Sequence, residues 1–287
     1  MSIKRLIFNF GLKYLPNTKL FDKLLCLIQF VIIHKRFPTS KKLFNDMIHK
    51  IKTTDIIDDP LIIFTSDKEY CKIFLSHVVE KKYIVPNLFI ANTFSEIENY
   101  RVTQDCIIKP THLASKCIFK KKNDILNDLD KQKIKNWFFQ NLYYGHRERN
   151  YLHLRPKVIV EPIIFNNENL IDFKFFCYNG KPRIIMLDFD KFTNKSRVFY
   201  DAEWNKIDVS LGKFKINNGF SKPKNLDEMI GLSERISKYF EFTRVDLYTN
   251  ENDILIGEVT HTHAAATQKF IPDGLNSEKK FSKILFS

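Results

Sequence analysis

The sequence contains no Cys-x-x-Cys pair, and its five cysteines are scattered through 287 residues. Zinc sites usually take cysteines from such short spacings, so the pattern argues against a zinc site. An odd number of scattered cysteines also gives no disulfide framework, and free thiols in a reducing cytosol are the plain interpretation. The sequence therefore predicts a cytoplasmic protein. The positions are Cys26, Cys71, Cys106, Cys117 and Cys177.

Long apolar runs are missing as well. The best candidate, residues 24–33, is about half of the ~20 apolar residues that a membrane span needs, and Lys23 and residues 34–36 flank it with basic groups. It also starts too late for a good signal peptide and lacks a small-residue cleavage site. A buried or partner-facing helix is the main interpretation. Peripheral attachment at the inner face of a membrane, helped by the basic flanks, is the alternative.

What the chain does have is apolar content and positive charge. Hydrophobic residues make up 44%, with 27 phenylalanines, which indicates a globular chain of one large domain or two small ones. The net charge of +13 favours a polyanionic partner: nucleic acid, an anionic membrane face, or an acidic small molecule or glycan. The sequence lacks a helix-turn-helix signature and an aromatic-basic RNP-type strand, so we expect no nucleic acid.

Local patterns predict helices first and strands later. No internal repeat or low-complexity linker interrupts them. The predicted helices cover residues 3–14, 20–35, 40–52, 68–82, 94–100, 128–142, 225–240 and 276–285. The predicted strands cover residues 106–110, 157–164, 171–178, 182–190 and 197–200, with a tight hairpin at Asn179-Gly180. This order predicts an α+β or mixed α/β fold, with an N-terminal helical segment at 1–60 and the rest of the fold at 61–287.

A hairpin near the C-terminus, residues 243–260 with a polar turn at 250–253, carries the most chemical information. If the turn is centred near Asn252, Asp246 lies opposite Glu258 and Arg244 lies opposite Thr260. Opposed side chains sit roughly 5 Å apart, where two carboxylates call for a cation between them. Oxygen ligands for Mg²⁺ beside an arginine suit a nucleotide triphosphate. The opposite face, which suits a core, would carry Val245, Leu247, Gly257 and Val259.

Several stretches, in the same order over residues 40–275, resemble ATP-grasp enzymes. Within that superfamily the chain resembles the TupA-like group linked to teichuronopeptide and other surface-polysaccharide synthesis. The stretches are residues 66–68, 107–112, 137–148, 155–161, 172–182, 197–201, 242–248 and 257–260. The resemblance implies an α+β ATP-grasp fold, in which lobes at about 61–155 and 156–287 clasp a nucleotide.

The resemblance also implies roles for the residues at the matched positions. Lys109 would neutralise phosphate oxygens of ATP, helped by Lys174 from a neighbouring strand. Arg244 would hold the γ-phosphate or an acyl-phosphate. The residues assigned to the phosphate-covering loop are His112, Ser115 and Lys116. The adenine hinge would comprise Glu161, Pro162 and Ile163, with Glu168 on the ribose hydroxyls, and the Mg²⁺ ligands would be Asp246, Glu258 and Thr260.

The implied reaction is phosphorylation of a carboxylate by ATP, followed by attack of an amine to give ADP, phosphate and an amide. An acidic sugar such as a uronic acid, coupled to an amino acid or amino sugar, suits the +13 charge. The loop at 111–117 departs from the family because it has no glycine to let backbone N–H groups approach phosphates. A catalytically weak relative that binds an anionic glycan, or a partner in a polysaccharide-assembly complex, is therefore the alternative.

Other polar residues keep two interpretations each. His261 and His263 share a face and either bind a metal or serve as structural or substrate-facing groups. Lys174 either contacts phosphate or pairs with Asp172. The residues that either bind a sugar or an acid, or belong to the core, are Tyr143, Tyr144, His146 and Arg147.

Overall fold

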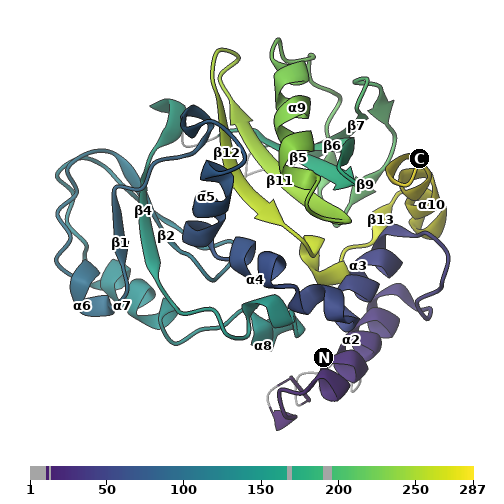
Figure 1. Ribbon diagram of the computed structural model, residues 1–287, viewed down its shortest axis with the longest axis horizontal. Coiled ribbons are helices and arrows are strands. Elements are labelled where there is room, and N and C mark those ends of the chain that lie inside the picture. Colours follow the sequence, from purple (N-terminus) through teal and green to yellow (C-terminus); the bar gives the residue numbers. More distant parts are fainter. Residues whose placement is uncertain (1–10, 13, 167–169, 190–195) are drawn as a thin grey trace.

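A computed structural model describes residues 11–12, 14–166, 170–189 and 196–287 (Figure 1). Its two main sheets are a four-stranded sheet in the order β1-β4-β2-β3 and a seven-stranded sheet in the order β10-β7-β6-β5-β11-β12, with β8 pairing with β7. Helices cover both sheets, and a small pair formed by β13 (Phe270–Ile271) and β9 (Ser210–Leu211) completes the described strands. The predicted α+β class is confirmed.

The four-stranded sheet is antiparallel and has its own small core. Its strands are β1 (Phe89–Ala91), β2 (Cys106–Pro110), β3 (Ile118–Lys120) and β4 (Val158–Pro162). Along β2, Cys106 and Ile108 are buried against α6 (Phe94–Ile97) and α7 (Asp128–Trp137). The alternation of β2 leaves Lys109 on the other face, because successive side chains of a strand point to opposite sides.

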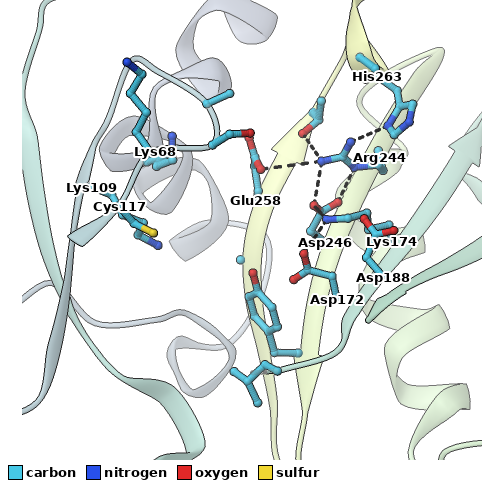
Figure 2. A pocket seen from close by; sticks show the side chains of 18 of the residues that line it. Lys68, Lys109, Cys117, Asp172, Lys174, Asp188, Arg244, Asp246, Glu258 and His263 are labelled. Atoms are coloured by element: carbon cyan, nitrogen blue, oxygen red, sulfur yellow. Dashed lines mark hydrogen bonds and ion pairs between the residues drawn. The ribbon is translucent and has the colours of Figure 1, made fainter. Parts of the chain in front are cut away.

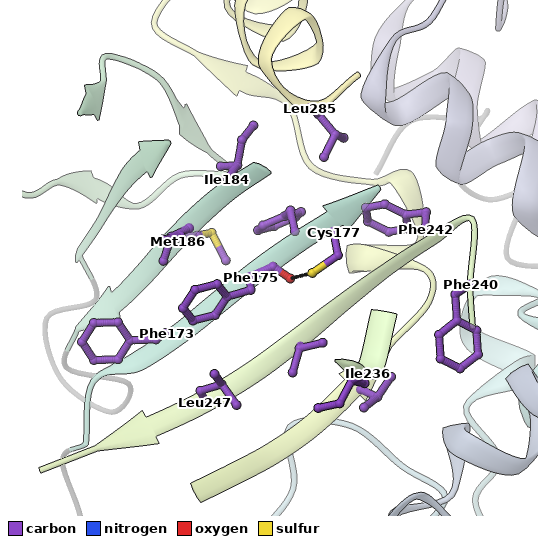
Figure 3. Close-up of a cluster of buried hydrophobic side chains, with 14 of the residues drawn as sticks. Phe173, Phe175, Cys177, Ile184, Met186, Ile236, Phe240, Phe242, Leu247 and Leu285 are labelled. Carbon is purple, nitrogen blue, oxygen red and sulfur yellow. Dashed lines mark hydrogen bonds between the residues drawn. The ribbon is translucent and has the colours of Figure 1, made fainter. Parts of the chain in front are cut away.

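The seven-stranded sheet holds the larger, phenylalanine-rich core (Figure 3). Its strands are β5 (Asp172–Tyr178), β6 (Lys181–Phe189), β7 (Ser196–Asp201), β8 (Lys206–Ile207), β10 (Lys215–Ile216), β11 (Phe242–Thr249) and β12 (Ile254–Thr260). Helices α9 (Leu226–Ser237) and α10 (Gly274–Leu285) pack onto it. The predicted hairpin at Asn179-Gly180 is confirmed, since both residues have positive φ and Tyr178 pairs with Lys181.

The N-terminal helices pack onto the large lobe. They are α2 (Lys19–His34) and α3 (Phe44–Thr53), followed by α4 (Pro60–Ser66) and α5 (Lys68–Ser76). Phe44 is fully buried and makes edge contacts with Phe176 and Phe281. None of the described helices is long and apolar enough to cross a membrane. Most of the helix predicted at 3–14 lies outside the described residues.

Two predicted helices are too long. The helix predicted to end at residue 82 ends at Ser76, and the chain then turns to bring Ile84 into a parallel bridge with Ile256 of β12. The helix predicted to end at residue 142 ends at Trp137. Beyond it, the Asn141 side chain donates to the carbonyls of Tyr151 and Leu152, a contact that local sequence does not reveal.

The C-terminal hairpin has the predicted register over its polar positions. Asp246 pairs with Glu258, and Arg244 pairs with Thr260. The register then shifts, so that Leu247 pairs with Ile256 and Gly257 forms a bulge. The prediction that Gly257 faces the core is wrong, because a Cβ at this position would lie 2.4 Å from the Tyr248 ring, and both residues line a cavity.

Candidate functional site

A cavity of about 830 Å³ lies between the two sheets (Figure 2). Most predicted site residues line it, although they come from positions far apart in the sequence. From the four-stranded sheet and the loops that follow its strands, which we call the small lobe, these are Lys109, Ser115, Lys116, Glu161, Pro162 and Ile163. From the seven-stranded sheet, which with its helices we call the large lobe, they are Lys174, Arg244, Asp246, Glu258 and Thr260. His112 does not line the cavity, and Glu168 lies outside the described residues.

Asp246 is the centre of the charge cluster on the large sheet. Arg244 holds both of its oxygens, with Nε to Oδ1 at 2.6 Å and Nη2 to Oδ2 at 2.8 Å. Lys174 Nζ lies 2.6 Å from Oδ2 and 3.0 Å from Asp172 Oδ2. The cation expected between the opposed carboxylates is therefore provided in part by Arg244, whose Nη2 is also 3.8 Å from Glu258 Oε2. Burial alone would lower the pKa of Lys174, but Asp172 and Asp246 outweigh it and raise the pKa.

On the small sheet, Glu161 sits between two lysines. It forms ion pairs with Lys109, from β2, and with Lys72, from α5, the latter at 2.5 Å. Burial alone would raise the pKa of this carboxyl, but the two lysines outweigh it and hold the pKa below its usual range. Glu161 thus positions the phosphate-binding candidate Lys109, a role that the sequence motif did not indicate.

The loop that follows β2 turns sharply without glycine. Ser115 takes the left-handed conformation, with φ of 57°. Lys68 Nζ donates to the Leu113 carbonyl at 2.6 Å, and Asp67 accepts a hydrogen bond from the Thr111 hydroxyl at 2.6 Å. Burial lowers the pKa of Lys68. Lys68, which also lines the cavity, was predicted as the start of a helix and lies in the matched stretch 66–68, but no site role was predicted for it.

Two side chains of this loop have partners on neighbouring segments. Lys116 donates to the side-chain oxygen of Gln140. The His112 ring is buried, and its Nε2 lies 3.1 Å from the Trp137 carbonyl and 3.2 Å from that of Gln140. In the structure, then, the His112 ring packs beneath the loop.

The polar pair on β11 and β12 offers the donor types that Mg²⁺ prefers. Asp246 and Glu258 present carboxylate oxygens, and the Thr260 hydroxyl accepts from Arg244 at 3.1 Å. The Glu258 side chain is 38% exposed, and its contact with Arg244 is long, so its oxygens are accessible. The donor types fit a hard cation, with both Asp246 oxygens already accepting hydrogen bonds from Arg244 and Lys174. Among the described residues, no group of three or more His, Cys, Asp or Glu side chains has the geometry to hold a metal by itself.

The two histidines after Thr260 have different surroundings. His261 is buried beside Thr65, whose hydroxyl lies 2.7 Å from its Nε2, and burial lowers its pKa to about 3. His263 lines the cavity, and its Nδ1 lies 2.6 Å from Nη1 of Arg244. Because a guanidinium only donates, this nitrogen must accept, so the proton of the neutral ring is on Nε2.

A left-handed turn follows His263, and sequence reasoning missed it. Ala264, Ala265 and Ala266 all have positive φ, between 47° and 60°. Such a conformation costs roughly 1–2 kcal/mol per residue for L-amino acids. Two N-terminal side chains hold it: His34 Nε2 lies 2.7 Å from the Ala266 carbonyl, and buried Lys52 donates to the Ala265 carbonyl at 3.1 Å.

Segment 143–151 forms another wall of the cavity. Tyr143 and Arg147 are buried, and both bind Asp22 of α2, so they are structural. His146 and Glu148 line the cavity instead. Of the four residues in 143–147 with open interpretations, the structure thus places two in the interior.

Two sheets that enclose a cavity, with lysines of one facing the acidic strand pair of the other, form an ATP-grasp fold. The match to a family model identifies the family: residues 36–279 match the TupA-like ATPgrasp family, and the chain belongs to it. No curated protein sequence matches the chain.

Solved structures also match the chain, at low identity. An L-amino acid ligase from Bacillus licheniformis is 11% identical, with a TM-score of 0.46 over 83% of this chain and 54% of that one. A D-alanine–D-alanine ligase from Bacillus anthracis, complexed with ATP, is 14% identical, with a TM-score of 0.38 over 69% and 54%. The ATP-grasp ligase PsnB, complexed with a minimal precursor, Mg and ADP, is 9% identical, with a TM-score of 0.40 over 71% and 53%. The match covers only about half the length of each.

Proposed function

We propose that the protein is an ATP-dependent carboxylate–amine ligase that forms an amide through an acyl-phosphate. The observation that carries the proposal is the cavity itself. It sets Lys109 of the small sheet opposite Arg244, Asp246 and Glu258 of the large one. Phosphoryl transfer needs positioned cations and charge-stabilising groups more than covalent chemistry by the protein, and this arrangement supplies them.

In the proposed reaction the small lobe binds the nucleotide. Pro162 and Ile163 line the adenine end, and Glu161 orients Lys109 towards the α- and β-phosphates. Ser115 and Lys116 belong to the loop that covers the phosphates. The sharp turn at Ser115 supports this assignment, because Ser115 takes a left-handed conformation that glycine adopts most readily, in a loop that lines the cavity.

The large lobe would act on the transferred group. Arg244 would hold the γ-phosphoryl group, and Lys174 would neutralise phosphate oxygens beside it. Asp246 and Glu258, with Thr260 beside them, would hold Mg²⁺, which when bound neutralises charge on phosphate oxygens. The His263 ring, which accepts from Arg244, fixes the direction of the guanidinium.

For the substrates, we propose an acidic sugar or glycan as the carboxylate and an amino acid or amino sugar as the amine, in surface-polysaccharide synthesis or decoration. The net charge of +13 supports an acidic substrate. A cytoplasmic location, with peripheral contact to the inner membrane face or an assembly complex, would suit this role.

The test is ADP release with ATP, Mg²⁺, a uronic-acid glycoside and the common amino acids. We expect turnover that Asp246→Asn and Glu258→Gln each reduce by about 10²-fold or more, because each removes a carboxylate that would hold Mg²⁺ against the phosphates. Absence of turnover with every pairing, together with no effect of either substitution, would contradict the proposal.

A second candidate is a non-catalytic relative that binds an anionic glycan or an assembly partner. The glycine-free loop favours it, as does the saturation of both Asp246 oxygens by Arg244 and Lys174. Thermal unfolding with and without ATP–Mg²⁺ separates the two, because a ligand that binds only the folded state raises the unfolding temperature. No shift favours the non-catalytic protein.

A further inference from the structure

One acid that lines the cavity differs from all the others. Asp246, Asp172 and Asp188 each contact a lysine or arginine, as do Glu161 and Glu258. Glu148 also lines the cavity, yet within the described part of the chain no lysine, arginine or histidine lies within ion-pair distance of it. Its carboxylate therefore forms no ion pair with the described residues.

The surroundings of Glu148 leave its carboxylate short of donors. The side chain is 95% buried, since only 5% of the residue is exposed, and it receives one side-chain hydrogen bond, from the Thr262 hydroxyl. A carboxylate can accept about four. Buried Lys52 lies behind it, but Lys52 donates to the Ala265 carbonyl at 3.1 Å and to Gln29 at 3.4 Å, not to Glu148.

Glu148 is close to the proposed reaction centre. Its partner Thr262 directly precedes His263, which accepts from Arg244 at 2.6 Å. Tyr151, one helical turn after Glu148 in the chain, lines the same cavity; burial raises the pKa of its phenol, and Glu148 and Glu258 raise it further. A group bound at Glu148 would therefore lie near the position assigned to the acyl-phosphate.

We propose that Glu148 is the subsite for the amine substrate and the base that activates it, with Thr262 as its positioning residue. The substrate class is a primary ammonium, such as that of an amino acid or amino sugar. This inference rests on the proposed ligase function and adds the second half of the reaction to it.

In the proposed step the ammonium binds to the Glu148 carboxylate and transfers one proton to it, which leaves a neutral amine. The nitrogen lone pair forms the bond to the acyl carbon, the carbon–oxygen bond to the phosphate breaks, and phosphate leaves with that electron pair. The second proton lost by nitrogen goes to the phosphate.

The charges around Glu148 fit a base. Burial raises its pKa above the usual value for a glutamate, while Lys52 and the Thr262 hydrogen bond lower it. The other titratable groups that interact with it are Cys26 of α2 and Tyr151, and burial raises the pKa of each. Both stay neutral near pH 7, so Glu148 is the group that can exchange a proton there.

The experiment separates the two halves of the reaction. Hydroxylamine, which is small and uncharged at neutral pH, traps an acyl-phosphate as a hydroxamate without needing a cation subsite. With ATP, Mg²⁺ and methyl glucuronide, we expect Glu148→Gln to keep forming hydroxamate while amide formation with alanine, lysine or glucosamine falls by about 10²-fold or more. Equal loss of both products would overturn the assignment of Glu148.

A second variant tests the base directly. Thr262→Val keeps the shape of the side chain but removes the hydrogen bond that lowers the pKa of Glu148. We expect the acidic limb of the amide-forming pH–rate profile to move to higher pH, while hydroxamate formation keeps its profile. An unmoved limb would overturn the base role. If the wild-type protein forms no hydroxamate with any acid, the ligase proposal itself fails, and the amine subsite falls with it.

Discussion

The two sheets differ in the ratio of acids to cations in their charge clusters. On the small sheet one carboxylate, that of Glu161, pairs with two lysines, and the Lys109 side chain remains 23% exposed. On the large sheet Asp246 and Asp172 enclose Lys174, and Asp246 also holds Arg244. The small-sheet wall of the cavity thus carries a partly exposed cation, Lys109, whereas the cavity-lining cations Lys174, Arg197 and Arg244 of the large sheet each pair with an acid. This difference suits the proposed ligase, in which the small-sheet wall would bind phosphates and the large-sheet wall would bind the reacting end.

The largest effect should come from breaking the large-sheet cluster. Asp246→Ala leaves Arg244 and Lys174, whose side chains are each 10% exposed, without their central partner. Removing one partner of a buried pair typically costs about 3–5 kcal/mol, and we expect a loss of that size in denaturant unfolding. Asp55→Ala is the control, because its pair with Lys19 is exposed and should matter little. Similar small losses in both variants would show that the cluster is not stabilising.

The small sheet should respond less, and in a way that depends on pH. The lysines depress the pKa of Glu161, so this carboxylate stabilises the fold above its unfolded pKa of about 4.3, and that contribution is lost as the pH falls through the folded pKa. Glu161→Gln should cost about 2 kcal/mol at pH 7 and flatten the decline of stability below about pH 5.

A matched control for Glu161 is Glu80→Gln, whose pair with Lys82 is more than half exposed on both sides. Its free energy of unfolding should change by less than about 1 kcal/mol, with the wild-type pH dependence kept. If Glu161→Gln shows the same acid-induced decline as the wild type, the two lysines do not hold its pKa down.

The pairing of the large-sheet hairpin could be predicted because the residues that determine it are close together in the sequence. Alternation with period two, and a polar turn, fix which residues of 243–249 oppose those of 254–260. The bulge at Gly257 could not be predicted, because it depends on the Tyr248 ring lying where a Cβ would otherwise be. The alternation of residues along the strands shows which positions pair, but not that the Tyr248 ring occupies the space beside Gly257.

Other features depend on contacts between distant segments. Glu148 and its partner Thr262 are 114 positions apart, so no local pattern marks the pair. Alanine normally favours right-handed helix, and the left-handed turn at 264–266 exists because Lys52 and His34, more than two hundred positions earlier, bind its carbonyls. Both the Glu148–Thr262 hydrogen bond and the left-handed turn therefore depend on tertiary contacts, which the sequence alone does not show.

The smallest effect on stability should come from Ser115→Gly in the loop at 111–117. Ser115 has φ of 57°, a conformation that glycine adopts without steric cost and that β-branched residues strongly disfavour. Ser115→Gly relieves this cost but increases the freedom of the unfolded chain, so its stability should stay within about 1 kcal/mol of the wild type.

Ser115→Val is the informative counterpart. It should destabilise the protein by about 1–3 kcal/mol, since a branched side chain must either strain the loop or leave the turn. The measurement is the shift in unfolding temperature that ATP–Mg²⁺ causes. If the turn at Ser115 helps to bind phosphates, this shift should be at least as large in the glycine variant as in the wild type, and smaller in the valine variant. Equal shifts in all three would mean that the positive wall of the cavity works through Lys109 and Lys68 alone, without the loop backbone.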